Sequence, residues 1–243
     1  RSGTRVLLAR AEEAREVLPD DRLADAVEEL GDDDAVALLS ALESARAADV
    51  LEAMQPDDAA DLVAELPQLK ADELLELMQP DDAADVRRLM RYDEYTAGGL
   101  MTTEPIILPP EASVATLLAQ ARKAEVPPAL AAVAFVCRPP LESPTGMYLG
   151  MVHLQRALRE RPQQMVGRIL DKDLGAVGPT DSIGTITRLL ATYNLTAMPV
   201  CDEAGRLVGA VSVDDVLDHL MPDDWREADD AVTDEIIERS ANA

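Results

Sequence analysis

An eight-residue string that recurs unchanged limits the folds open to the first part of this 243-residue chain. Residues 54–61 have the sequence Met-Gln-Pro-Asp-Asp-Ala-Ala-Asp, and residues 78–85 repeat it after a spacing of 24. Residues 30–37 form a looser copy at the same spacing. A unit of this length that opens with Pro-Asp-Asp accommodates two short helices, with proline at the first helical position. Stacked units of this kind predict an all-α, superhelical solenoid over residues 1–97.

The rest of the chain contains a second kind of repeat, in which short apolar strands are separated by turn residues. Three pairs of segments align, with offsets of 69, 64 and 59: residues 110–114 with 179–183, 136–137 with 200–201, and 149–153 with 208–212. The falling offset places two insertions in the first copy, at the proline-marked loops around Pro127 and in residues 138–144. Each copy predicts strand, helix, strand, strand, helix, and the pair is expected to pack as one pseudo-symmetric α/β unit.

Two strings carry a resemblance to known families. Residues 195–217 combine a Pro-Val strand, an Asp-Glu-x-Gly turn and the pattern Gly-x-Val-Ser-x-x-Asp, and they resemble the second half of a CBS motif, a regulatory module that usually occurs in tandem. Residues 92–102 have the pattern Tyr-x-x-x-x-Ala-Gly-Gly-Leu-Met-Thr between the helical repeat and this pair. From about residue 20 to residue 222, the chain is similar to the intracellular half of MgtE-type magnesium channels.

This resemblance implies an α+β multidomain fold with a tandem CBS pair after the solenoid. The expected domains are an MgtE-N-like helical domain at 1–97, a first CBS repeat at 98–165 and a second at 166–222. Residues 223–243 are an acidic tail that is expected to be poorly ordered. The tail does not resemble the linker that precedes the membrane domain in the channels, which favours a relative without a pore over a transporter cut before its membrane part.

The net charge of −25 excludes some partners. A nucleic-acid backbone or an anionic membrane surface requires cationic neutralisation, so neither is expected to bind. Carboxylates suit divalent cations, although a solvated acidic face is the simpler explanation of the composition. Only two cysteines are present, and no apolar run is long enough for a signal peptide or a membrane span. A cytoplasmic protein is therefore expected.

A nucleotide site is the first candidate function. In CBS modules that bind adenine nucleotides, the Ser/Thr and Asp of the motif hold the ribose and phosphate end, which the resemblance transfers to Ser212 and Asp215. Thr180 and Pro199 complete the expected set. The first repeat has His153 at the position of Ser212 and lacks the ribose acceptor, so at most one adenosine site is expected. Alternatively, Ser212 is only a helix N-cap and Asp215 only an acid in the first turn.

A set of magnesium sites is the second candidate. Mg²⁺ prefers carboxylate oxygens and keeps several of its waters, so one or two protein ligands per ion suffice. The resemblance implies that magnesium bridges the acidic solenoid and the CBS pair, through Asp57 and Asp61 on one side and Asp214, Asp215 and Asp218 on the other. Each aspartate in a first helical turn also complements the helix dipole, which needs no ion.

Catalysis is not expected, because no nucleophile–base pair, phosphate loop or zinc spacing occurs. The expected partners are a second copy, through the CBS pair, and a membrane magnesium channel domain if one exists. The favoured hypothesis is a cytoplasmic magnesium sensor. Its rivals are an adenine-nucleotide-binding regulatory protein unconnected with transport, and an adaptor that holds a protein partner on the solenoid.

Overall fold

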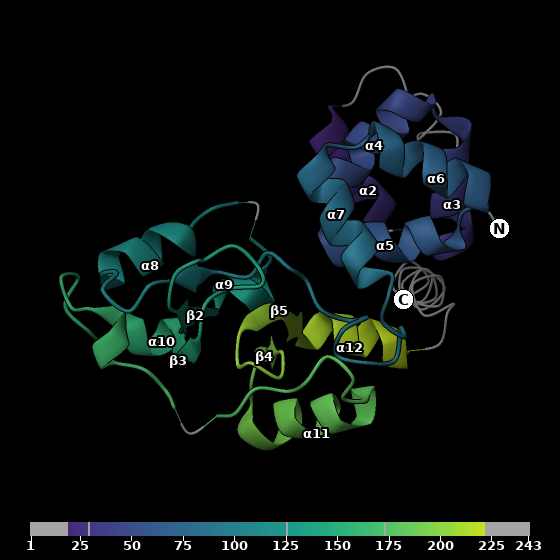
Figure 1. Ribbon diagram of the computed structural model, residues 1–243. Coiled ribbons are helices and arrows are strands. Elements are labelled where there is room, and N and C mark those ends of the chain that lie inside the picture. Colours follow the sequence, from purple (N-terminus) through teal and green to yellow (C-terminus); the bar gives the residue numbers. More distant parts are fainter. Residues whose placement is uncertain (1–18, 29, 125, 173, 222–243) are drawn as a thin grey trace, which may run out of the picture. The chain divides into compact units, whose positions relative to one another are not determined.

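The computed structural model describes residues 19–28, 30–124, 126–172 and 174–221 (Figure 1). The chain divides into two compact units, with the boundary between Val86 and Arg87. The described part of the first unit is helical, whereas the second combines helices with two small sheets. These observations confirm the predicted fold class, an all-α solenoid followed by an α/β pair. The predicted tail at 223–243 lies outside the described residues.

Short helices follow one another through the first unit at the spacing that the sequence repeat predicts. They are α2 (Asp20–Glu28), α3 (Asp32–Ala41), α4 (Ser44–Ala53), α5 (Pro56–Glu65), α6 (Gln68–Leu77) and α7 (Pro80–Leu89). Alternate helices stack on one another, α2 on α4, α4 on α6, and α3 on α5. Leu23, Leu39, Leu51 and Leu74 are fully buried between them, so the apolar stripe of each short helix is covered by its neighbours.

Hydrogen bonds that recur at the spacing of 24 residues hold successive helical repeats of the first unit together. Glu28 at the end of α2 accepts a hydrogen bond from the backbone N–H of Gln55, which precedes α5, with an O···N distance of 3.2 Å. Glu52 accepts the equivalent bond from the N–H of Gln79, which precedes α7, at 2.5 Å. Both donors belong to helix starts, where N–H groups have no partner within the helix. A glutamate of one helical repeat thus accepts a hydrogen bond from a backbone N–H group at a helix start of the next repeat.

The second unit contains both α/β repeats. Its elements are β1 (Ile107–Leu108), α8 (Val114–Gln120), α9 (Pro128–Ala131), β2 (Val133–Cys137), β3 (Tyr148–His153), α10 (Leu154–Ala157), the 3-10 turn η1 (Val166–Arg168), α11 (Ile183–Tyr193), β4 (Ala197–Cys201), β5 (Leu207–Ser212) and α12 (Val213–Leu220). The sheet of the first repeat has the order β1-β2-β3, with β1 parallel and β3 antiparallel to β2. The second repeat forms the antiparallel hairpin β4-β5.

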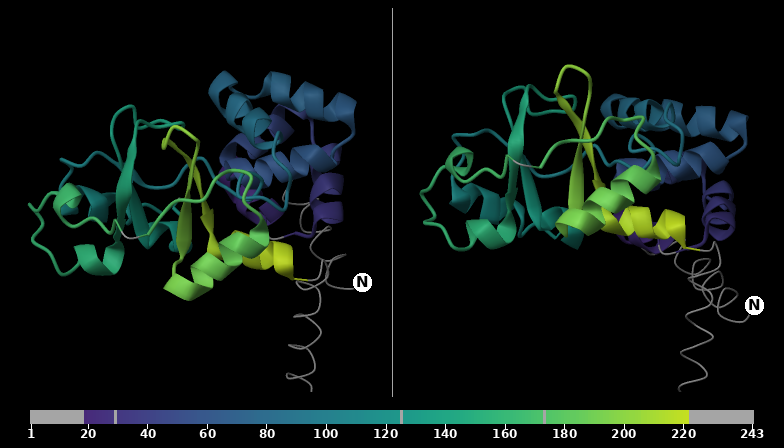
Figure 2. Two further views of the ribbon diagram at one scale, coloured as in Figure 1. Left: turned by 60° about the horizontal axis from the view of Figure 1, so that its bottom comes forward. Right: turned by 90° about the horizontal axis from the view of Figure 1, so that it is seen from below.

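The two hairpins lie side by side (Figure 2). The N–H of Tyr148 donates to the carbonyl of Gly205 at 2.9 Å, and the backbones of Met147 and Arg206 form an antiparallel β-bridge. The expected opening strand of the second repeat is reduced to one parallel bridge between Val177 and Val200. Gly178 and Pro179 follow Val177 directly, and such residues interrupt a strand.

Side chains of β2 alternate between two hydrophobic clusters, as the two-residue period of a strand requires. Ala134 and Val136 join the core of the first repeat. Phe135 and Cys137 join a second cluster that also contains Leu207 of β5. Because it is buried on both faces, β2 forms the centre of the unit.

Two segments each pair with the repeat that they do not lead into, and we call them the exchange segments. Residues 96–102 lead into the first repeat but pair with the second, and residues 165–171 lead into the second repeat but pair with the first. Thr102 exchanges two backbone hydrogen bonds with Ala210 of β5, at 2.9 and 3.0 Å. At the equivalent place Asp171 exchanges two with Met151 of β3, at 2.8 and 3.2 Å. A Cβ on Gly209 would lie only 2.6 Å from the carbonyl oxygen of Thr102, so this close approach requires glycine.

Candidate functional site

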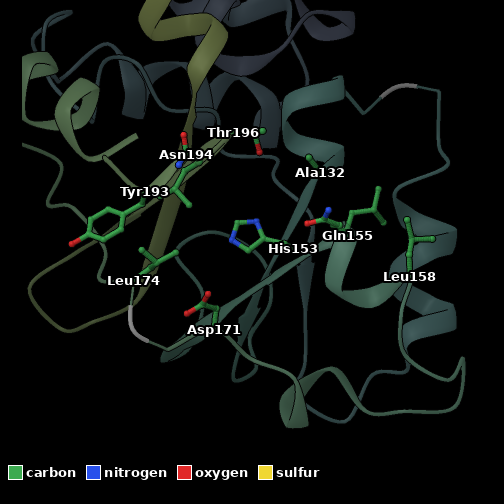
Figure 3. A pocket seen from close by; sticks show the side chains of 11 residues that line it. Ala132, His153, Gln155, Leu158, Asp171, Leu174, Tyr193, Asn194 and Thr196 are labelled. Carbon is green, nitrogen blue, oxygen red and sulfur yellow. The ribbon is translucent and has the colours of Figure 1, made fainter. Parts of the chain in front are cut away.

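An open cleft of about 740 Å³ lies within the second unit, between the two repeats (Figure 3). Its volume is in the range of small-molecule sites. The lining residues come from the turn before β2, from the end of β3 with α10 and the residue after it, from an exchange segment and the residues that follow it, and from the end of α11 with the turn before β4. They are Ala132, His153, Leu154, Gln155, Leu158, Asp171, Leu174, Tyr193, Asn194, Leu195 and Thr196.

One wall of the cleft carries two ionisable side chains. His153 is the last residue of β3 and precedes α10, at the position that Ser212 occupies in the second repeat. Asp171 is held beside this strand by its paired backbone bonds to Met151. Gly150, next to Met151, has φ of 139°, a conformation that only glycine adopts readily. The strand end and the exchange segment together present the imidazole and the carboxylate to the cleft (Figure 3).

The opposite wall is formed where α11 ends. Asn194 adopts the left-handed conformation (φ 52°, ψ 48°) at the C-cap, which asparagine tolerates better than most residues. The Thr196 hydroxyl oxygen is buried and has no hydrogen-bond partner among the described residues. A buried hydroxyl without a partner costs free energy, so it favours a ligand that supplies one. The ring of Tyr193 is 53% exposed and provides an apolar surface.

The cleft therefore combines apolar walls with a few convergent polar groups, a composition typical of small-molecule sites. The side chains of Gln155, Asn194 and Thr196 can donate or accept hydrogen bonds, as a nucleobase or sugar requires. Asp171, the one carboxylate among the described lining residues, disfavours a bare phosphate. A polyphosphate would need a cation to accompany it into the cleft.

The residues predicted to bind a nucleotide do not line this cleft. Ser212 and Asp215 cap α12 reciprocally: the Ser212 hydroxyl accepts from the N–H of Asp215 at 3.2 Å, and the Asp215 carboxylate accepts from the N–H of Ser212 at 3.1 Å. The Ser212 hydroxyl also donates to that carboxylate. Pro199 is buried within β4, and Thr180 is exposed in the turn before α11. This is the capping arrangement that the sequence left open as an alternative.

The environment of Asp215 disfavours its charge. Burial raises the pKa of this carboxyl, the hydrogen bonds from Ser212 act in the opposite direction, and the charges of Asp214 and Asp218 raise it further. A cation close to these three carboxylates would reverse this effect.

The residues predicted to bind magnesium lie on two helices, one in each unit. Asp57 and Asp61 are one turn apart on α5, where Asp57 is buried and Asp61 exposed. Asp214 and Asp218 are exposed and one turn apart on α12, with the partly buried Asp215 between them. Within the described residues, no three His, Cys, Asp or Glu side chains gather closely enough to enclose a metal ion. The structure thus offers carboxylate pairs rather than a closed cage.

No sequence motif predicts Asp171, Tyr193 or Thr196 as site residues. The alignment of the repeats places His153 opposite Ser212, and the lack of a ribose acceptor in the first repeat predicts no adenosine site there. A signal was available in the same alignment, because Asp171 occupies the position of Thr102 in the other exchange segment. The pairing of these segments with the opposite repeats is a tertiary feature that the alignment does not show.

Comparisons with known proteins bear on both units. The family model of the MgtE intracellular N domain matches residues 8–95, and that of the CBS domain matches residues 166–222. Magnesium transporter MgtE of Thermus thermophilus is 34% identical over 135 residues, which make up 56% of this chain and 29% of that protein. The chain therefore spans less than a third of this curated relative. No helix among the described residues is long and apolar enough to cross a membrane.

Two solved structures extend the comparison. The soluble part of a magnesium transporter is 25% identical to this chain and superposes on it with a TM-score of 0.76. The match covers 86% of this chain and 80% of the transporter chain. The cytosolic domain of the Mg²⁺ channel MgtE in complex with ATP is 29% identical, covers 85% and 92%, and has a TM-score of 0.51. They confirm the resemblance found in the sequence. The chain therefore consists of an MgtE intracellular N domain followed by a CBS pair, the domain combination of the cytosolic part of MgtE-type magnesium transporters.

Proposed function

We propose that this chain is a cytoplasmic, non-catalytic magnesium-sensing module of an MgtE-type transporter or of a relative without a pore. In this proposal Mg²⁺ bridges the acidic faces of the helical domain and the CBS pair, through Asp57 and Asp61 on α5 and Asp214, Asp215 and Asp218 on α12. The observation that carries the proposal is the pair of carboxylates one turn apart on a helix of each domain. The domain combination, which a magnesium channel shares, supports it.

Electrostatics supplies the mechanism of sensing. Like charges one helical turn apart repel each other, and two acidic faces repel each other further. A divalent cation that keeps most of its waters relieves this repulsion with only one or two protein ligands on each side. The fraction of chains with bound Mg²⁺ then rises with the free magnesium concentration, and bound Mg²⁺ favours the arrangement in which the two acidic faces are close together.

Limited proteolysis with small-angle X-ray scattering tests this proposal. We expect millimolar Mg²⁺ to reduce the radius of gyration and to protect the junction around Gly98 and Gly99 from protease. The Asp214→Asn/Asp218→Asn variant should show neither change. Glu111→Gln, which removes an exposed carboxylate from the first CBS repeat, is the matched control and should respond as the wild type does. A wild-type protein that ignores Mg²⁺ in both measurements would contradict the proposal.

The cleft favours a second candidate function, the binding of an adenine nucleotide. The unpartnered Thr196 hydroxyl and the apolar walls suit a nucleoside, and a relative has been solved with ATP. Because of Asp171, ATP would enter with magnesium, so both effectors can act on the same module.

Binding of AMP and of Mg–ATP to three proteins tests this candidate. Thr196→Val keeps the side-chain shape but removes the hydroxyl, and should weaken binding roughly tenfold. Asp215→Asn should bind as the wild type does, because Asp215 is engaged in capping α12. If Asp215→Asn weakened binding and Thr196→Val did not, the nucleotide would bind at Ser212 and Asp215 and not in the cleft. If neither nucleotide binds the wild type, this second function is wrong.

We also propose that the module acts as a homodimer through its CBS pair, and that a membrane magnesium channel domain is its partner where one exists.

A further inference from the structure

The last turn of α12 is in contact with the segment that leads into the CBS pair. The rings of Tyr95 and His219 meet edge to face, with their centroids 6.2 Å apart and their planes at 88°. This is a favourable geometry for two aromatic rings. Tyr95 lies directly before the exchange segment at residues 96–102, and His219 is the penultimate residue of α12. The contact therefore joins two elements that are far apart in the chain.

The two ends of α12 are held by different groups. At its start, Ser212 and Asp215 cap each other. At its end, the Nδ1 atom of His219 lies 3.2 Å from the carbonyl oxygen of Asp215, and the His219 ring packs on Tyr95. A helix of eight residues frays readily at an end that nothing supports. The ring contact thus acts on the turn in which support matters most.

The backbone that carries the Tyr95 ring is itself fixed on the second repeat. The carbonyl of Tyr95 accepts a hydrogen bond from the N–H of Ile183, at the start of α11, at 2.9 Å. The N–H groups of Ala97 and Gly98 donate to carbonyls within residues 179–181, each at 2.8 Å. Because its backbone is already ordered, the Tyr95 ring can restrain a neighbouring side chain at little further cost in entropy.

The restrained turn contains one of the two carboxylates that α12 offers to magnesium. Asp218 directly precedes His219, and Asp214 lies one turn earlier. Residues four apart are neighbours on the surface of a helix, but they separate when the turn between them unwinds. An ion that binds a frayed turn must first order it, and the lost chain entropy weakens binding.

We propose that Tyr95 is a positioning residue of the magnesium response: its ring keeps the last turn of α12 helical and so holds Asp218 one turn from Asp214. This inference rests on the magnesium sensing proposed above and adds a residue that acts through His219 instead of binding the ion.

Small-angle X-ray scattering of the full chain at a series of Mg²⁺ concentrations tests this role. The readout is the concentration that gives half of the change in the radius of gyration. Tyr95→Ala should raise it about threefold to tenfold, the range expected from the loss of one aromatic contact. Tyr95→Phe keeps the ring and should respond at the wild-type concentration. Met165→Ala, which removes an apolar side chain of similar exposure from the first repeat, is the matched control.

A second substitution separates positioning from general destabilisation. In a His219→Ala background, Tyr95→Ala should not raise the half-maximal concentration further, because the ring partner is already absent. An equal increase in both backgrounds would show that Tyr95 does not act through His219, and would overturn the inference. Far-UV circular dichroism verifies folding. Tyr95→Leu, which keeps apolar bulk without the ring, replaces Tyr95→Ala if that variant does not fold.

The same titration distinguishes failure of this inference from failure of the proposed function. A wild type whose radius of gyration ignores Mg²⁺ would overturn both together. A wild type that responds, with Tyr95→Ala responding at the same Mg²⁺ concentration, would overturn the role of Tyr95 alone.

Discussion

At the residue scale, the carboxylate of Glu28 in the solenoid makes a hydrogen bond between helical repeats, and its partial burial disfavours its charged form. It accepts the N–H of Gln55. Burial raises the pKa of Glu28, the bond from Gln55 lowers it, and the charge of Asp25 raises it, with a net increase above the ordinary 4.5. The folded state therefore binds this proton more tightly than the unfolded state does. The resulting stability is full below pH 4.5 and is lost as the pH rises through the raised pKa.

Glu28→Gln should remove this pH dependence, because the amide still accepts the N–H of Gln55 and cannot ionise. Relative to the wild type, the variant should gain stability as the pH rises from 4.5, and the gain should level off above the raised pKa. Its size should stay below about 1 kcal/mol, since Glu28 is partly solvated. Urea denaturation at a series of pH values measures it. Glu43→Gln, the same change on an exposed side chain, is the control, and an equal pH dependence in both variants would contradict this account.

At the scale of elements, the exchange segments determine how the CBS pair is assembled. The sequence predicts the helices, both hairpins and their pseudo-symmetry, because proline, glycine and apolar periodicity are local signals. It does not predict that residues 96–102 complete the second repeat and residues 165–171 the first. That pairing depends on contacts between residues far apart in the chain, such as Thr102 with Ala210.

Two glycine substitutions test the importance of this exchange. Gly209→Ala places a Cβ against the carbonyl of Thr102 and should destabilise the protein by about 1–3 kcal/mol. Gly184→Ala, inside α11, meets no atom within 4 Å and should stabilise it by about 0.5–1 kcal/mol. Thermal denaturation of both variants gives the comparison. Equal effects would show that the close approach at Gly209 is not needed.

At the scale of the whole molecule, the sequence predicts the domain combination but not the cleft. The domain combination is predicted from the repeat of 24 residues, the junction around Gly98 and Gly99, and the CBS-like string at residues 195–217. The cleft depends on the Thr196 side chain facing His153 and Asp171 across two repeats. That the Ser212 hydroxyl caps α12 instead of facing this cleft is a second feature of the structure. Neither is visible in a residue pattern, because the same Ser-x-x-Asp string serves ligand binding and helix capping equally well.

The central claim is that magnesium binds the carboxylates of both domains, and isothermal titration of the chain with Mg²⁺ tests it most directly. We predict saturable binding in the millimolar range that is lost in Asp57→Asn and in Asp214→Asn, while the Glu111→Gln control binds as the wild type does. Loss in both variants would place the ions on both acidic faces. Wild-type protein that binds no Mg²⁺, or binding that both variants retain in full, would contradict the account.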